Sequence, residues 1–206
     1  MTVLYVAAGA CSLAAHSLVH ELELPIRVEV VPLCTPDSPI HRINPLGRVP
    51  ALVLEDGTLI TENVAILPYL ADLQPRAGLL PPFGSAERAR VISWLGYLAS
   101  EVHVGGFRPL NRPERYSDDT AAHPGIQARA AEQLRKALLH VDQHLEGRQW
   151  LEGDRYSIAD AYLGVFAGWL TRHGERFADL RNIARLGEAF RARGATQRAL
   201  AAEAGN

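Results

Sequence analysis

Cys11 is the residue of this sequence whose type and position are best suited to chemistry. It follows Gly9-Ala10 at the end of an apolar run and opens a segment with helical spacing. The N-terminus of a helix presents unpaired N–H groups and positive potential, which stabilise a thiolate. Such a thiolate could form a mixed disulfide with a thiol ligand or exchange with it. A free cysteine is also often a small buried residue without chemistry.

Two other side chains could assist a thiol near Cys11. The Ser12 hydroxyl could donate a hydrogen bond to a ligand thiolate and lower the thiol pKa, or it could simply cap the helix. His103 stands near the end of a long helical pattern, where its imidazole could polarise a thiol or a substrate. The alternative for His103 is a histidine favoured by the negative end of the helix dipole.

A β-hairpin is predicted in the middle of the first half. The apolar runs Ala51–Leu54 and Thr58–Ile60 flank Glu55-Asp56-Gly57, and Asp-Gly between apolar runs is a strong hairpin signal. Thr61-Glu62-Asn63 then opens a helical pattern.

Val49-Pro50 stands directly before this hairpin. Proline cannot donate to a sheet ladder, so its position at the mouth of a strand needs a reason. One reason is a cis peptide bond, which would leave the backbone groups of Val49 free to pair with an extended peptide ligand.

The order of elements in the first half predicts a β-α-β unit followed by a hairpin and a helix. This βαβ-ββα order matches a thioredoxin-like fold, in which the first two strands are parallel. The expected strands are Val3–Ala7, Arg27–Leu33, Ala51–Leu54 and Thr58–Ile60, and the expected helices are Cys11–Leu24 and Glu62–Leu73, with at most a short helix in Thr35–Ile43.

The second half has no strand pattern and predicts an all-α bundle, so the fold class is α/β plus all-α. We expect a first domain at residues 1–76, a Pro- and Gly-rich linker at 77–85, and a helical domain at 86–206. The expected helices are Ala86–Val104, Ile126–Leu145, a segment capped by Ser157-x-x-Asp160 and running through Trp169, Arg181–Arg193 and Thr196–Ala204, with a loop at Arg108–Gly125.

Composition narrows the class of protein. The 206 residues are 48% hydrophobic with a formal net charge of -2, which gives no electrostatic case for nucleic acid or a membrane surface. Two cysteines do not make a disulfide framework, and the apolar start lacks the positive residues of a signal peptide. We therefore expect a cytoplasmic protein. The scattered histidines predict no metal site.

Three blocks of the sequence resemble the glutathione S-transferase family. They are Tyr5-x-x-x-Gly-Ala-Cys-Ser-Leu-Ala-x-His16, which resembles its bacterial beta class; Asn44-Pro-x-Gly-x-Val-Pro-Ala-Leu52 with Asp56-Gly-x-Leu-x-Thr-Glu-Asn63; and Ser157-Ile-Ala-Asp-Ala-Tyr-Leu163. They occur in family order across nearly the whole chain. The resemblance implies a detoxification enzyme that joins glutathione to a small electrophile, assembled as a homodimer.

The resemblance also implies roles for individual residues. It places Cys11 and His103 near the glutathione sulfur, the Val49 backbone against the cysteinyl part if Pro50 is cis, and Glu62 and Asn63 at the γ-glutamyl group. Arg48 stands where the family often has glutamine, and it could meet the glycyl carboxylate or simply be solvated. The resemblance also suggests an apolar wall for the electrophile. The candidates for that wall are Ala10, Phe107, Pro109 and Trp169, each of which could instead belong to the hydrophobic core.

The sequence departs from the family in its positive charges. Val104 stands where the family has a lysine after the histidine, and Leu33–Ile43 is short and lacks another lysine, for which Arg42 or Arg48 could substitute. Two alternative functions follow: thiol exchange or reductive dehalogenation through Cys11, and a non-catalytic glutathione-fold binding protein.

Overall fold

The N-terminal part of the chain folds as a four-stranded sheet with helices against it. The structure is a computed structural model that describes every residue except 34, 36 and 206. The strands are β1 Val3–Val6, β2 Arg27–Val30, β3 Ala51–Val53 and β4 Leu59–Thr61. In the sheet order β2-β1-β3-β4, β1 is parallel to β2 and antiparallel to β3, which is antiparallel to β4. The expected thioredoxin-like arrangement is therefore confirmed.

Three helices accompany this sheet: α1 Leu13–Glu21, α2 Ile40–Ile43 and α3 Asn63–Leu73. The leucines at the expected helical spacing are buried, because they form the face of α1 that packs into the core. They are Leu13, Leu18 and Leu22, and Leu24 just beyond the helix is buried with them. The short helix expected before the hairpin is α2, although Cys34 and Pro36 lie outside the described residues.

The predicted hairpin joins β3 and β4. Gly57 has a φ of 87°, a conformation that glycine adopts without steric cost. The Asp56 carboxylate accepts a hydrogen bond from the backbone N–H of Thr58 at 2.9 Å, and this bond stabilises the turn.

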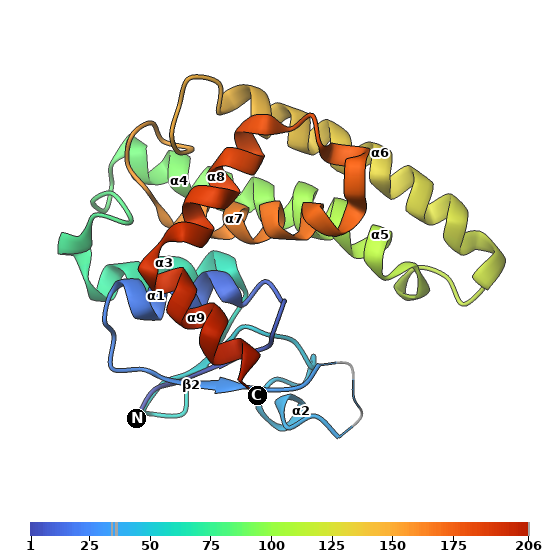
Figure 1. The fold of residues 1–206 in the computed structure, drawn as a ribbon. Helices are drawn as coiled ribbons and strands as arrows, with labels where there is room; N and C mark the ends of the chain where they lie inside the picture. The colour runs from blue at the N-terminus through green and yellow to red at the C-terminus, as the bar shows by residue number, and fades with distance from the viewer. Residues whose placement is uncertain (34, 36, 206) are drawn as a thin grey trace.

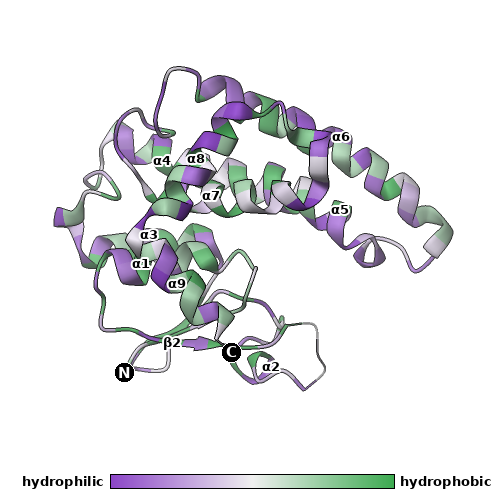
Figure 2. Ribbon diagram, viewed as in Figure 1, coloured by the Kyte–Doolittle hydropathy of each residue, from purple (hydrophilic) through white to green (hydrophobic). Residues whose placement is uncertain are grey.

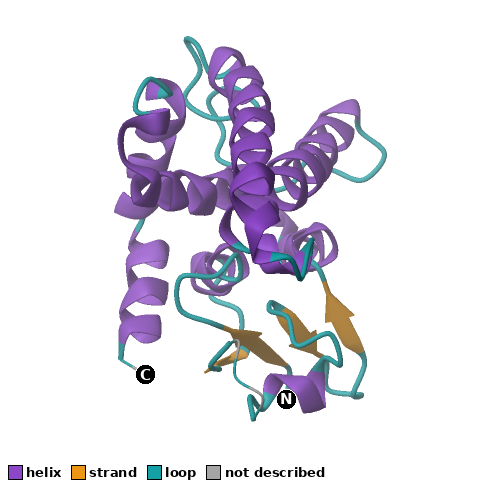
Figure 3. Ribbon diagram, turned by 90° about the vertical axis from the view of Figure 1, so that its right-hand side faces the viewer, coloured by secondary structure: helices purple, strands orange, loops and turns teal. Residues whose placement is uncertain are grey.

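The remaining chain is helical and forms a layer above the sheet domain (Figure 1). Its elements are η1 Pro75–Ala77, α4 Ala86–Tyr97, η2 Leu98–Phe107, α5 Arg108–Asn111, η3 Pro113–Arg115, η4 Thr120–Ala122, α6 His123–His144, α7 Ile158–Leu170, η5 Thr171–Phe177, α8 Arg181–Ala192 and α9 Gly194–Ala204. After the view is turned, α9 is seen to run back down beside the sheet domain (Figure 3). No helix among the described residues combines the length and apolar character that a bilayer crossing needs.

The first long helix of this layer differs from its prediction. Instead of ending at Val104, α4 passes into the wider π-helical turns of η2 and then into α5. Gly106 allows this close packing, because a Cβ atom there would lie 2.7 Å from the Leu134 side chain of α6. The loop expected from Arg108 onward therefore begins as a helix. Widened turns of this kind occur often at functional sites.

Helix α7 forms the centre of the helical layer. It is coloured mostly green and white, whereas α6 alternates purple with green (Figure 2). Asp160 is fully buried at its N-terminus and accepts hydrogen bonds from Ser157 N at 2.8 Å, Ser157 Oγ at 2.7 Å and Leu151 N at 2.8 Å. These bonds confirm the predicted capping box and tie the preceding loop to the helix.

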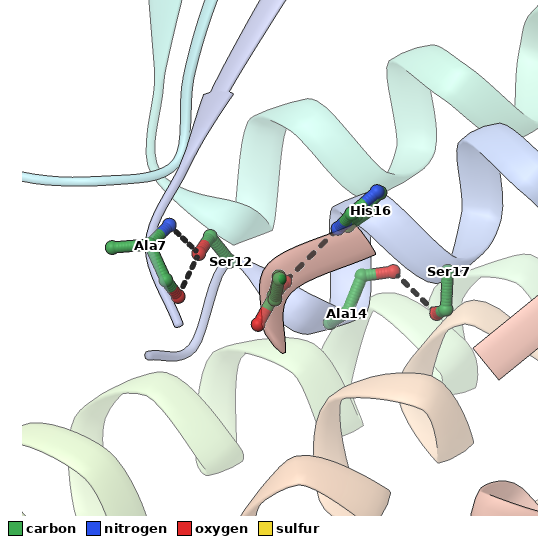
Figure 4. A network of polar contacts seen from close by, with 6 residues as sticks. Ala7, Ser12, Ala14, His16 and Ser17 are labelled. Atoms are coloured by element: carbon green, nitrogen blue, oxygen red, sulfur yellow. Dashed lines mark hydrogen bonds and ion pairs between the residues drawn. The ribbon is translucent and has the colours of Figure 1, made fainter. Parts of the chain in front are cut away.

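The C-terminal helix α9 packs on α1 and links the end of the chain to the sheet domain. His16 of α1 and Glu203 of α9 form a buried pair with 2.9 Å between Nδ1 and Oε1 (Figure 4). Both side chains are at most 4% exposed. The second carboxylate oxygen of Glu203 has no hydrogen-bond partner within the described part of the chain.

Candidate functional site

The candidate site lies where the N-terminal ends of α1 and α3 approach η2 and α7. Cys11 is half-buried in the turn before α1, and its thiol donates a hydrogen bond to the carbonyl oxygen of Val49 at 3.5 Å. The Asn63 amide at the start of α3 donates to the carbonyl oxygen of Cys11 at 3.1 Å. The Val49–Pro50 peptide bond is cis, as the ligand-pairing expectation requires. Three segments that are distant in sequence thus converge on Cys11.

The electrostatic environment of Cys11 differs from the expectation of a thiolate. Burial and the negative charge of Glu62 raise the pKa of the Cys11 thiol to about 12, although Arg108 acts in the opposite direction. Helix α1 begins at Leu13, two residues after the cysteine. The effect of the helix N-terminus is therefore smaller than the cost of burying the charge, and the thiol is neutral near pH 7.

Ser12 is occupied by structural contacts. It is fully buried, and its hydroxyl accepts a hydrogen bond from Ala7 N at 3.0 Å and donates to Ala7 O at 3.4 Å (Figure 4). Its side chain makes no capping bond to α1. Neither expected role is supported, since the hydroxyl instead joins the end of β1 to the start of α1.

Glu62 and Asn63 form the N-terminal edge of α3. Glu62 is exposed and has a φ of 67°, a left-handed conformation that costs a non-glycine residue energy and often marks a functional position. Asn63 is 3% exposed, and its Oδ1 has no hydrogen-bond partner within the described residues. A free carboxylate and an unpaired amide oxygen beside a helix N-terminus suit a ligand with both an ammonium and a carboxylate group.

His103 lies in η2 and reaches α7. Its Nδ1 is 3.0 Å from the Tyr162 hydroxyl, and its ring packs against Phe166 and Trp169 at centroid distances of 5.4 and 5.3 Å. Burial, together with the positive charges of Arg108 and Arg48, lowers the pKa of His103 to about 4. The imidazole is therefore neutral near pH 7.

Tyr162 is a residue of the site that the sequence analysis did not identify. It is 3% exposed, and burial raises its pKa, while the nearby Asn63 side chain acts in the opposite direction. The available signal was its spacing: Tyr162, Phe166 and Trp169 follow one another at i, i+4 and i+7, so they share one face of α7.

The apolar wall differs in part from its prediction. Trp169 is half-buried, and its indole N–H donates to Gly9 O at 3.0 Å, which brings it beside half-buried Ala10. Phe107 is only 1% exposed and Pro109 is also buried, so neither lines a surface open to a ligand. The π-helical turns direct Phe107 into the core. There its ring packs edge to face against Trp169, with 5.2 Å between the two ring centroids.

Arginines supply the positive charge around the site. The charges of Arg48 and Arg108 both act on His103. Arg172 of η5, which the sequence analysis did not single out, covers Gly9, because a Cβ atom there would lie 3.0 Å from its Nη2. Among the described residues, no group of three or more His, Cys, Asp or Glu side chains could hold a metal ion.

Comparisons with known proteins agree on one family. The family model described as "Glutathione S-transferase, N-terminal domain" matches residues 8–73, and "Glutathione S-transferase, C-terminal domain" matches residues 116–193. The chain is 39% identical over 199 residues to glutathione S-transferase GstA of Escherichia coli O157:H7, covering 95% of each protein.

Solved structures give the same result. A sphingomonad glutathione S-transferase complexed with glutathione is 36% identical, with a TM-score of 0.87 and 98% coverage of both chains. A bacterial beta class glutathione S-transferase of Sphingomonas chungbukensis is 35% identical, again with a TM-score of 0.87 and 98% coverage of both chains.

Proposed function

Because the chain belongs to the glutathione S-transferase family, we propose that it conjugates glutathione to small hydrophobic electrophiles. The observation that carries this proposal is the convergence on Cys11. There the Val49 backbone, the free polar groups of Glu62 and Asn63 and the aromatic face of α7 meet in one place.

The tripeptide would lie along the loop before β3. Glu62 pairs with the α-ammonium of the γ-glutamyl group, whose carboxylate meets the N-terminus of α3. The backbone of Val49 pairs with the cysteinyl part as an added strand. The Cys11 thiol donates a hydrogen bond to the carbonyl oxygen of Val49 in the structure. This hydrogen bond would have to break when the ligand pairs with that oxygen. Exposed Arg48 meets the glycyl carboxylate.

The reaction needs a glutathione thiolate held beside the electrophile. The thiol of glutathione releases its proton to water, and the sulfur electron pair forms a C–S bond to the electrophilic carbon. The leaving group departs with the electron pair of the bond that breaks. The site contributes alignment of the two reactants and hydrogen bonds and positive charge that stabilise the thiolate.

Thiol exchange and reductive dehalogenation through Cys11 receive less support. Both require this cysteine to act as a thiolate, whereas its surroundings keep the thiol neutral. We propose instead that Cys11 forms part of the surface beside the glutathione sulfur.

Calorimetric titration with glutathione tests the proposal, followed by conjugation of 1-chloro-2,4-dinitrobenzene. Glu62→Gln removes the partner of the ammonium, and a charge-assisted hydrogen bond is worth about 1.5–3 kcal/mol, so we expect glutathione to bind about 10- to 100-fold more weakly. Glu132→Gln removes an exposed carboxylate from α6 and serves as the control.

The possible results separate enzyme from binding protein. No binding of glutathione at millimolar concentration would overturn the proposal. Binding without conjugation of several electrophiles would favour the non-catalytic alternative. The homodimer and the cytoplasmic location implied by the family are part of the same proposal, and light scattering of the purified protein tests the former.

A further inference from the structure

The guanidinium of Arg172 lies over the turn that precedes Cys11. A Cβ atom added at Gly9 in this turn would be 3.0 Å from its Nη2. Trp169, three residues earlier, donates its indole N–H to the carbonyl oxygen of the same Gly9 at 3.0 Å. Side chains three residues apart are neighbours on a helix surface. The end of α7 and the start of η5 therefore bring an aromatic ring and a positive charge to one turn of the site.

A second arginine reaches the same wall from η2. Arg108 directly follows Phe107 in the chain. The Phe107 ring contacts that of His173, the residue after Arg172, with 6.1 Å between the ring centroids. The backbone N–H of Arg108 donates to His103 O, so one π-helical turn separates the arginine from that histidine. The charge of Arg108 acts on His103, which agrees with a side chain directed into the site.

Both guanidinium groups lack a carboxylate partner. Arg108 and Arg172 are not among the arginines that form ion pairs in the described part of the chain. Glu175, three residues beyond Arg172, is in none of these pairs either. Arg172 is exposed and Arg108 is half-buried. A guanidinium without a protein partner at the border of a site suits an acidic group of a ligand, because it can hold a carboxylate by two parallel hydrogen bonds.

The acidic group would belong to the second reactant and not to glutathione. The proposed pose places the γ-glutamyl carboxylate at the N-terminus of α3 and the glycyl carboxylate at Arg48. Trp169, beside Ala10, belongs to the wall proposed for the electrophile. Since Arg172 meets the same turn as Trp169, its charge lies on the electrophile side of the reacting sulfur.

We propose that Arg172 selects aromatic electrophiles that carry a carboxylate or another acidic group, by pairing with that group while the ring lies against Trp169. This inference rests on the proposed function for the reaction itself. The glutathione sulfur forms its bond to a ring carbon, and a halide leaves with the electron pair of the bond that breaks. The acidic group keeps its charge throughout, so its contact with Arg172 orients the ring in every step.

Two electrophiles of different charge test this selection. In 4-chloro-3-nitrobenzoate and 4-chloro-3-nitrobenzamide the reacting carbon has the same chloride and nitro group, and only the first compound is charged at pH 7. Each kcat/KM is divided by the rate constant of the uncatalysed reaction with glutathione, which corrects for intrinsic reactivity. We expect the wild-type protein to favour the acid by about three- to tenfold, between the values of an exposed ion pair and of a sheltered charged hydrogen bond.

Substitution of the arginine tests its part in the preference. Arg172→Gln removes the charge and keeps a polar side chain, so the acid-to-amide ratio should fall to about one, whereas Arg172→Lys should keep part of the preference. Arg129→Gln removes an exposed arginine of α6 that pairs with Glu132, and it should keep the wild-type ratio. Calorimetry with the two glutathione conjugates gives the same comparison without turnover, and the acidic conjugate should bind more tightly only when Arg172 is present.

A wild-type ratio of one, or a ratio that Arg172→Gln leaves unchanged, would overturn the inference. Equal losses for both electrophiles together with weaker binding of glutathione in Arg172→Gln would also overturn it, because the guanidinium would then serve the tripeptide. Failure of the proposed function would look different: glutathione would not bind and neither electrophile would be conjugated.

Discussion

Cys11 should be an unusually unreactive thiol despite its position before a helix. With a pKa of about 12, its thiolate fraction at pH 7.5 is about 10⁻⁴·⁵, against roughly 0.1 for an ordinary cysteine with a pKa of about 8.5. The more basic thiolate is intrinsically more nucleophilic, which raises its alkylation rate roughly 40-fold for a Brønsted slope near 0.45 and partly offsets its smaller population. The net expectation is alkylation about 100-fold slower than that of a free thiol.

The measurement is the rate of reaction with iodoacetamide, followed by mass spectrometry between pH 6.5 and 10. A Cys34→Ser background leaves Cys11 as the only thiol of the chain. Unfolding in guanidinium provides the control, since the rate should then rise to that of a free cysteine. An alkylation rate in the folded protein within tenfold of a free thiol, or an inflection below pH 8.5, would refute the reasoning.

The same reasoning predicts the effect of removing the thiol. Cys11→Ala should reduce conjugation by less than about threefold, because the nucleophile is the sulfur of glutathione rather than that of the protein. A loss of more than 100-fold in kcat, with glutathione binding intact, would show that Cys11 takes part in bond formation. Thiol exchange would then return as the better description of the activity.

Three further predictions concern stability. Asp160→Ala should lower the free energy of unfolding by about 3–5 kcal/mol, measured by urea denaturation, because it leaves three donors without an acceptor. Asp160→Asn keeps one acceptor oxygen and should cost less. Equal losses in the two variants would contradict this account. In the same assay, Glu203→Ala should cost about 1–3 kcal/mol by leaving the His16 ring nitrogen buried without its partner, whereas Glu203→Gln keeps an acceptor and should cost less. The folded pKa of His103 is about 4, so between pH 6.5 and 4 the unfolded chain binds more protons than the folded one. As the pH is lowered through this window, the free energy of unfolding should fall by at most about 3 kcal/mol because of His103. The fall should be shallower in His103→Gln.

Short-range signals were sufficient for most of the fold. The Asp-Gly turn, the leucine spacing of α1 and the capping box before α7 each act within a few residues, and each formed as predicted. The element ends moved, because strand pairing and not residue preference sets where β1 and β2 stop. The boundary between the two domains stays a prediction.

The site was harder to predict, because its chemistry depends on contacts between distant segments. Sequence spacing placed Cys11, Val49 and Asn63, but it could not show that burial outweighs the helix N-terminus at the thiol. Phe107 was assigned to the ligand surface because the π-helical turns of η2, which direct it into the core, have no local signature. Tyr162 was missed because only the folded chain brings its hydroxyl to His103.

The charges of the site lie at its edge, while the groups at its centre are neutral. Burial raises the pKa of the Cys11 thiol and of the Tyr162 phenol and lowers that of the His103 imidazole, so all three are uncharged near pH 7, whereas Glu62 and Arg48 are exposed. These three groups contribute no charge of their own, so a bound glutathione thiolate would bring its negative charge to neutral neighbours. It would be stabilised by neutral N–H donors and by arginines at a distance, without a nearby lysine to form an ion pair. Neutral donors held in place by buried contacts are already oriented when the charge appears, so their geometry should govern the rate more than the ionic strength of the solution.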